Sequence, residues 1–242
     1  MCMCYSLTLL EPDTLQLRYA ARFPATWDFT PTYYLNAFSL PEYPVLADMD
    51  QTQFHTMIWG LIPFWTKTMS DAEKLRVQTM NARSETIFEK PSFRSAIRKR
   101  RCIIPADGFF EWRCYHGKNY PYYIYLKNHD IFSIAGIWEA WKNPETESTI
   151  LTFSVITCEA NPLMQKIHNK KKRMPVILPK EQEKQWLTAN LSEDDIKAFL
   201  QPYPQEHMQA HTISKRVTST ALPRNVPEVI EPFRYPDLPS LE

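Results

Sequence analysis

Runs of β-branched and aromatic residues fill the middle of the chain, a pattern typical of β-strands. The runs lie at residues 56–61, 102–104, 122–126, 131–137, 150–157 and 175–178. Between about residues 102 and 157 they follow one another with no helical pattern between them. Doubly wound parallel sheets alternate strands with helices, so this order favours an antiparallel or mixed sheet.

Helical patterns mark three other segments, which are residues 13–23, the stretch after Pro179, and residues 192–200. The candidate buried positions of the first segment are Leu15, Leu17, Tyr19 and Ala20. The last segment opens on Ser192 with an acidic residue three positions later, as a capped helix does. No Gly/Ser-rich linker divides the chain. We therefore expect one α+β domain, with a mixed, mostly antiparallel sheet and flanking helices.

Composition excludes several classes of function. The chain has only four glycines, none close to another, whereas dinucleotide fingerprints and Walker loops need clustered glycines to bring backbone N–H groups to phosphate. The five cysteines contain no C-x-x-C pair, so we expect no disulfide framework and no metal site. No basic leader opens the chain and no apolar run reaches membrane-spanning length. We expect a cytoplasmic protein that has no membrane partner.

Charge is nearly balanced overall but unevenly distributed. The net charge is +1, yet basic residues gather without any carboxylate in residues 90–106, 161–180 and 209–227. Such segregation is what a phosphate-binding face requires. Ordinary solvated loops would give the same pattern, so charge alone leaves nucleic-acid binding open.

Cys2 stands out because of its position. Removal of the initiator Met1, usual before a small residue, would leave a thiol and an α-amine on adjacent carbons. Their ordinary pKa values are about 8.5 and about 7.7–8.0, so both are partly nucleophilic near neutrality. With an aldehyde, the amine forms a Schiff base and the thiol closes a five-membered thiazolidine in a fast intramolecular step. If Met1 stays in place, Cys2 has no such role.

Four motifs occur in order after Cys2: Trp59–Trp65, Met80–Thr86, Arg101–Trp112 and Ile167–Leu178. Together they closely resemble the SRAP family, the SOS response-associated peptidases, which crosslink protein to DNA at abasic sites. The resemblance runs from residue 2 to about residue 231. It implies a barrel-like core in an SRAP domain at 1–231, with a tail at 232–242. We also expect a monomer that needs no cofactor.

The resemblance implies roles for four catalytic residues. Cys2 would form the thiazolidine with the open aldehyde of an abasic sugar. Asn81 would orient the N-terminal residue, and Glu111 would assist ring opening and proton transfer. His168 would act as acid and base when the Schiff base forms or reverses. Ring opening and loss of water both need acid–base help, so the chemistry itself calls for such a pair.

Single-stranded DNA carrying the abasic site would be the partner. The resemblance places Arg83 on phosphate and Trp65 beside the DNA near the lesion. The basic stretches that lie among the motifs add Arg173 and Lys215 as candidate DNA contacts, because cations on phosphates and rings on bases are the usual means of holding a single strand.

The start of the chain departs from the family, which usually reads Cys-Gly-Arg where this chain has Cys2-Met3-Cys4. The phosphate-binding arginine is missing, and Lys170–Lys172 are candidates to replace it. Initiation at Met3 would instead make Cys4 the mature N-terminus. Cys2 is favoured because residues 5–7 then align with the family without a gap.

Three functions remain open at this stage. The first is covalent shielding of abasic sites in the DNA-damage response, with self-processing peptidase or lyase-like activity and crosslink reversal as further steps. The second is a thiol peptidase or amidohydrolase with an N-terminal cysteine nucleophile that acts on proteins. The third is a non-covalent reader of modified DNA bases.

Overall fold

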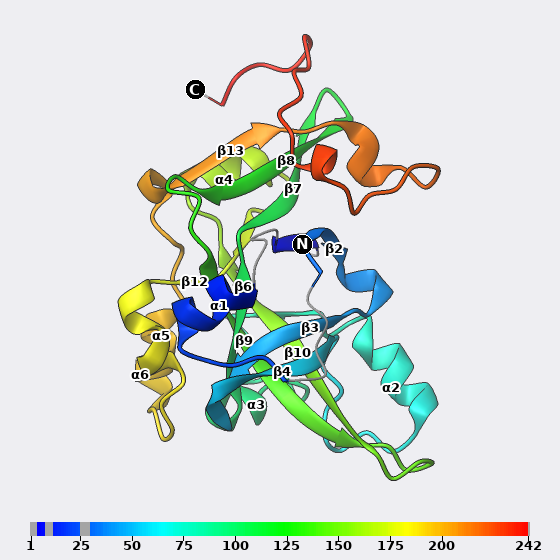
Figure 1. The fold of residues 1–242 in the computed structure, drawn as a ribbon, viewed down its shortest axis with the longest axis vertical. Coiled ribbons are helices and arrows are strands. Elements are labelled where there is room, and N and C mark those ends of the chain that lie inside the picture. Colours follow the sequence, from blue (N-terminus) through cyan, green and yellow to red (C-terminus); the bar gives the residue numbers. More distant parts are fainter. Residues whose placement is uncertain (1–3, 8–11, 25–29, 242) are drawn as a thin grey trace.

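The structure, a computed structural model, describes residues 4–7, 12–24 and 30–241. Two β-sheets form its framework, and the helices lie around them (Figure 1). The first sheet has the strand order β13-β8-β7-β1-β2. Its strands are β1 (Cys4–Leu7), β2 (Thr32–Asn36), β7 (Gly108–Tyr115), β8 (Lys118–Leu126) and β13 (Met208–Thr212).

The second sheet closes on itself, because β10 pairs with both β4 and β9. The resulting ring has the order β4-β3-β6-β9-β10, and all its pairings except the parallel β4–β10 pair are antiparallel. Its strands are β3 (Glu42–Ala47), β4 (Asp50–Trp59), β6 (Arg101–Ala106), β9 (Phe132–Lys142) and β10 (Thr149–Glu159). Three short strands pair with strands of the ring: β5 (Asn81–Arg83) and β11 (Arg173–Pro175) with β10, and β12 (Ile177–Leu178) with β9. The expected α+β fold with a barrel-like, mostly antiparallel core is confirmed.

Short helices cover the outside of the sheets. They are α1 (Pro12–Tyr19), α2 (Met69–Arg76), α3 (Ala96–Lys99), α4 (Pro162–Ile167), α5 (Glu183–Trp186) and α6 (Glu193–Phe199). Single 3₁₀ turns are η1 (Ala37–Ser39), η2 (Lys180–Gln182), η3 (Gln205–His207), η4 (Lys215–Thr218) and η5 (Pro227–Val229). No helix in the described ranges is long and apolar enough to cross a bilayer.

Two of the predicted helices can be compared with α6 and α1. Ser192 caps α6 as predicted, and its hydroxyl and the Asp195 carboxylate form a reciprocal capping box. The helix predicted over residues 13–23 is too long. Helix α1 ends at Tyr19, because Ala20 takes a left-handed conformation with φ 51°. Only Leu15 of the proposed stripe is fully buried, and Leu17 is 84% exposed.

Aromatic stacking joins the two sheets. The rings of Tyr5 and Trp59 stack at 4.8 Å between centroids, and those of Trp59 and Phe153 at 5.7 Å. These residues belong to β1, β4 and β10, so the N-terminal strand of the first sheet is packed directly on the barrel. Burial of large rings supplies much of the hydrophobic stabilisation of such a core. The end of β1 is thereby held in one place.

The C-terminal segment lies against the first sheet. Tyr120 in β8 donates a hydrogen bond to Asp237, and the Tyr235 hydroxyl donates to the carbonyl of Ile213 at 2.9 Å. Arg113 in β7 donates to the carbonyl of Pro239 at 2.7 Å. The segment predicted as a tail thus makes specific contacts with the first sheet, while the boundary at residue 231 stays a prediction.

Candidate functional site

Glu111 and His168, two of the predicted catalytic residues, are in contact. Glu111 lies on β7, and His168 is the residue that ends α4. The His168 Nδ1 atom is 3.4 Å from Glu111 Oε1. Both residues are buried, with 2% and 5% of their surfaces exposed. An acid–base pair withdrawn from water in this way is typical of a reaction site.

Asn169, which the sequence analysis did not single out, holds this pair together. Its amide group bonds both backbone groups of Cys114 on β7, accepting from the N–H at 3.0 Å and donating to the carbonyl at 2.8 Å. This two-point contact clips the turn after α4 to β7 and so places His168 beside Glu111. The amide next to the histidine was visible in the sequence, but its partner was not.

The protonation state of His168 follows from its surroundings. Burial lowers the pKa of His168, and the Glu111 carboxylate and the Arg173 carbonyl oppose that shift only in part. The imidazole is therefore neutral at pH 7. Nδ1 lies 2.9 Å from the Arg173 carbonyl oxygen, which can only accept, so Nδ1 carries the hydrogen. The basic lone pair of the ring is then on Nε2.

Asn81, Arg83 and Arg173 gather at one end of β10. Thr157 of β10 pairs with Arg83 of β5 on one side and with Pro175 of β11 on the other. Asn81 is 7% exposed, and neither its amide nitrogen nor its amide oxygen has a hydrogen-bond partner among the described residues. A buried amide of this kind is suited to bind a polar group brought to it.

The two arginines at this end of β10 differ in whether the guanidinium is already bonded within the protein. Arg83 is exposed, which suits a phosphate contact. Arg173 is bound within the protein, where its guanidinium contacts the Glu85 carboxylate and donates to the Thr157 carbonyl at 2.6 Å. Arg173 thereby fixes the carbonyl that holds His168. Its DNA contact stays a prediction.

Cys4 and Cys2 differ in what the structure says of them. Cys2 lies outside the described residues. Cys4 is 5% exposed on β1, and its thiol donates to the Tyr34 hydroxyl at 3.3 Å. Burial raises the pKa of Cys4 to about 12, and the nearby Glu111 carboxylate adds to the shift. The Cys4 thiol therefore stays protonated at neutral pH and is a poor nucleophile.

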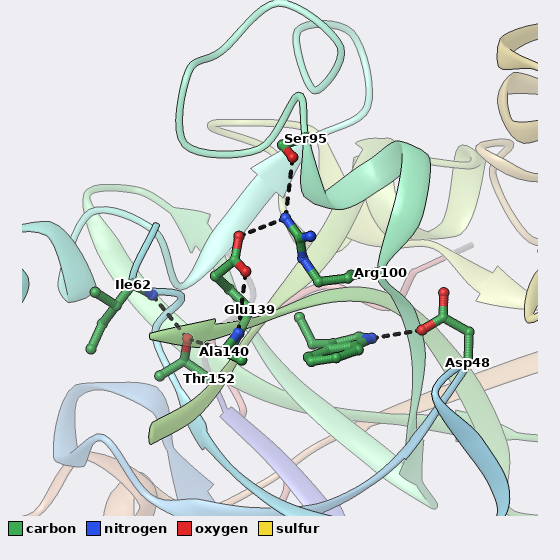
Figure 2. A network of polar contacts seen from close by, with 8 residues as sticks. Asp48, Ile62, Ser95, Arg100, Glu139, Ala140 and Thr152 are labelled. Atoms are coloured by element: carbon green, nitrogen blue, oxygen red, sulfur yellow. Dashed lines mark hydrogen bonds and ion pairs between the residues drawn. The ribbon is translucent and has the colours of Figure 1, made fainter. Parts of the chain in front are cut away.

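Trp65 lies on an anchored loop between β4 and α2 and is 44% exposed. The Ile62 N–H donates to the Thr152 hydroxyl at 3.0 Å, and the Trp141 indole N–H donates to the carbonyl of Thr66 at 2.8 Å. Figure 2 shows the first of these bonds beside the buried carboxylate of Glu139. The loop thus presents Trp65 to solvent from a fixed base, as a stacking platform requires.

The basic stretch at 90–106 carries less surface charge than its sequence suggests. Arg100 donates to Glu139 and Ser95 (Figure 2), and Arg98 pairs with Glu193. Arg101 is 1% exposed, and its guanidinium donates only to backbone carbonyls. Half of the cations counted in this stretch therefore serve the fold.

The other two basic stretches reach the surface. Lys170–Lys172 are exposed on the turn that follows His168. Lys215 is exposed on η4, whose Val217 packs in one apolar cluster with Cys4 of β1. Arg224 lies over the ring of Tyr34, 5.3 Å from its centroid. Lys215 and Arg224 therefore lie close to β1, on which the first described residues lie.

Across residues 4–7, 12–24 and 30–241, no group of three or more His, Cys, Asp or Glu side chains is placed to hold a metal ion.

Comparison with known proteins identifies the family of this chain. The sequence model of the SOS response associated peptidase (SRAP) family matches residues 1–220. The chain belongs to the SRAP family. The matched residues include every site residue predicted from the sequence.

Two related proteins cover 95% and 77% of the chain. The abasic site processing protein YoqW of Bacillus subtilis is 38% identical over 233 residues, which are 95% of this chain and 99% of that protein. The abasic site processing protein HMCES of Pongo abelii is 31% identical over 77% of this chain and 58% of its own length. A crystal structure of a Bacteroides thetaiotaomicron protein superposes with a TM-score of 0.88 at 38% identity, covering 96% of this chain and all of that one.

Proposed function

We propose that this protein captures abasic sites in single-stranded DNA by a covalent bond to Cys2. The α-amine, freed by removal of Met1, adds to the open aldehyde of the abasic sugar, and loss of water gives an imine. The Cys2 thiol then adds across the C=N bond, with its proton passing to nitrogen, and closes a thiazolidine. No oxidant, reductant or cofactor enters this sequence of steps.

The observation that carries the proposal is the buried contact between Glu111 and His168. It supplies a carboxyl group and a neutral imidazole at one place, as reversible water loss requires. Membership in the SRAP family and the names of the relatives, which process abasic sites, support the choice of substrate. The protonated state of Cys4 supports Cys2 as the nucleophile.

The remaining residues take binding roles in this proposal. The Asn81 amide would accept and donate to the N-terminal residue, since it is buried and unpaired among the described residues. Arg83 and Lys215 would contact phosphates, and Trp65 would stack on a base beside the lesion. The same Glu111 and His168 would serve in reversal of the imine, because the forward and reverse reactions share one transition state.

The deciding experiment uses an oligonucleotide that carries one abasic site. Wild-type protein should give a heat-stable, slower band on a denaturing gel, and Cys2→Ala should give none. Cys4→Ser should retain the band. An intact mass that includes Met1 in an adduct-forming sample would contradict the mechanism. Peptide turnover without any DNA adduct would favour the thiol peptidase.

A second prediction concerns pH. The α-amine must be neutral, so the single-turnover rate should fall about tenfold per pH unit below about 7.7 in every variant. In wild-type protein the decline should steepen below pH ~6.5, because a lowered pKa means that His168 becomes protonated only in this range and then loses its role as a base. His168→Gln should be slower and keep the single slope. Identical slopes in both proteins would exclude His168 as the base.

A further inference from the structure

Arg76, the last residue of α2, is buried without a partner. It is 8% exposed, and its Nε atom is buried with no hydrogen-bond acceptor. Among the described residues, its guanidinium makes no hydrogen bond or ion pair. Glu73, on the preceding turn of the same helix, is the one charge that acts on its pKa in the described part of the chain, and it makes no direct contact.

Other buried arginines of the described chain show how unusual this is. Arg101 donates to four backbone carbonyls, and Arg18 binds the Glu183 carboxylate with two nitrogens. A guanidinium N–H group withdrawn from water without an acceptor is costly, so such groups are normally paired. Burial lowers the pKa of Arg76, which expresses the same cost. The fold therefore bears a penalty at the Nε atom, while the terminal nitrogens of the guanidinium, which are not fully buried, are open to an anion.

The position of Arg76 indicates which anion. The end of α2 packs on Gly60, where an added Cβ would lie 2.9 Å from the Arg76 carbonyl oxygen and 3.2 Å from Leu40. Gly60 leads into the loop that carries Phe64 and Trp65, which are 59% and 44% exposed. Exposed rings and cations are the components of a single-strand groove, and here they lie on a loop and a helix that pack together at Gly60.

A hollow lies beside α2. It has a volume of about 450 Å³ and is lined by Trp65, Thr66, Lys67, Asp71, Lys74 and Leu75. Thr66 is 7% exposed, and its buried hydroxyl has no partner in the described residues. The surface beside α2 thus offers a ring, two lysines and one carboxylate.

We propose that Arg76 is a phosphodiester contact, which binds the backbone of a single strand whose base stacks at Trp65. The inference rests on the proposed DNA-binding function and adds a residue to it. Because the terminal nitrogens of the guanidinium have no protein acceptor, they can donate charge-assisted hydrogen bonds to phosphate without giving up an internal partner. The cost of the buried, unpaired Nε atom is present in the unliganded protein.

The test exploits two effects of opposite sign. Arg76→Met keeps the buried stem and removes the charge, so it should raise the melting temperature of the unliganded protein by roughly 2–4 °C. The same variant should bind an undamaged oligonucleotide about tenfold more weakly at low salt. Its salt dependence, the slope of log affinity against log salt, should be shallower by about 0.7. Arg76→Lys should restore the slope.

Arg101→Met is the matched control, because it removes a buried guanidinium that is fully paired. It should lower the melting temperature and leave the salt dependence unchanged. An Arg76→Met protein that is less stable, or that binds with the wild-type salt dependence, would overturn the inference. These assays need no abasic site, so they stay separate from the Cys2 adduct assay. If no oligonucleotide binds, stabilisation by inorganic phosphate that Arg76→Met abolishes would support the anion site, and its absence would reject it.

Discussion

Glu111→Gln should slow adduct formation at least 100-fold, the range typical of a lost general acid or base. The side chain is 2% exposed and lies 3.4 Å from His168, so a carboxyl group stands at the reaction site that can exchange a proton with the substrate, which the glutamine amide cannot do. Glutamine has nearly the same shape and should fit the site. The rate should be measured at saturating protein with an abasic oligonucleotide, by quenching samples onto a denaturing gel.

Glu183→Gln provides the control for loss of a buried carboxylate. Glu183 is 7% exposed, and its carboxylate accepts hydrogen bonds from Arg18 and Ser133, neither of which is a predicted site residue. This variant should lose stability but form the adduct at the wild-type rate. Affinity for an undamaged strand should be normal in both variants. A Glu111→Gln rate within threefold of wild type would remove Glu111 from the mechanism.

A double variant tests whether the pair acts as one unit. If Glu111 and His168 serve the same proton transfers, adding His168→Gln to Glu111→Gln should cost little more than the slower single change. Fully multiplicative losses would mean that the two residues serve separate steps. This comparison distinguishes a shared relay from two independent catalysts, which the 3.4 Å contact alone does not.

The parts of the fold that were predictable are those set by local pattern. The β-branched runs between residues 102 and 157 correspond to parts of β6, β8, β9 and β10, with no helix between them. The Ser192 capping box marked the start of α6. Strand β5 could not be predicted, because its three residues are a strand only through pairing with β10. Helix α2 was missed although Thr68 and Asp71 give it a cap, since it buries only Ala72 and Arg76 and has little apolar periodicity.

The same limit applies to the site. Residue types and motif order brought Cys2, Asn81, Glu111 and His168 into one hypothesis, and the structure places Glu111 against His168. That contact depends on Asn169 bonding the backbone of Cys114, which no local pattern reveals. Burial also determines whether a basic residue is available to bind phosphate. Arg101 looked like part of a phosphate-binding surface and is instead bonded to carbonyls inside the fold.

Gly108→Ala should destabilise the protein by about 1–3 kcal/mol, the usual cost of overpacking. A Cβ at this first residue of β7 would lie 2.2 Å from the ring of Tyr123, which is itself 7% exposed. Moving that ring would disturb the pairing of Gly108 with Ser6 of β1, and with it the strand that carries Glu111. The free energy of unfolding should be measured by urea titration.

Gly117→Ala gives the comparison that isolates the clash. Its Cβ would meet nothing within 4 Å, but its φ of +76° costs a side chain about 1–2 kcal/mol through backbone strain alone. Replacing the Tyr123 ring by a smaller side chain should separate the steric clash from the backbone strain. Tyr123→Leu should recover stability in the Gly108→Ala protein, because a Cβ at position 108 would contact the ring. It should recover none in the Gly117→Ala protein, where a Cβ would contact nothing. Equal coupling in both would show that the Tyr123 ring does not require a glycine at position 108. The adduct rate of Gly108→Ala should fall together with its stability, since β7 both receives β1 and positions Glu111.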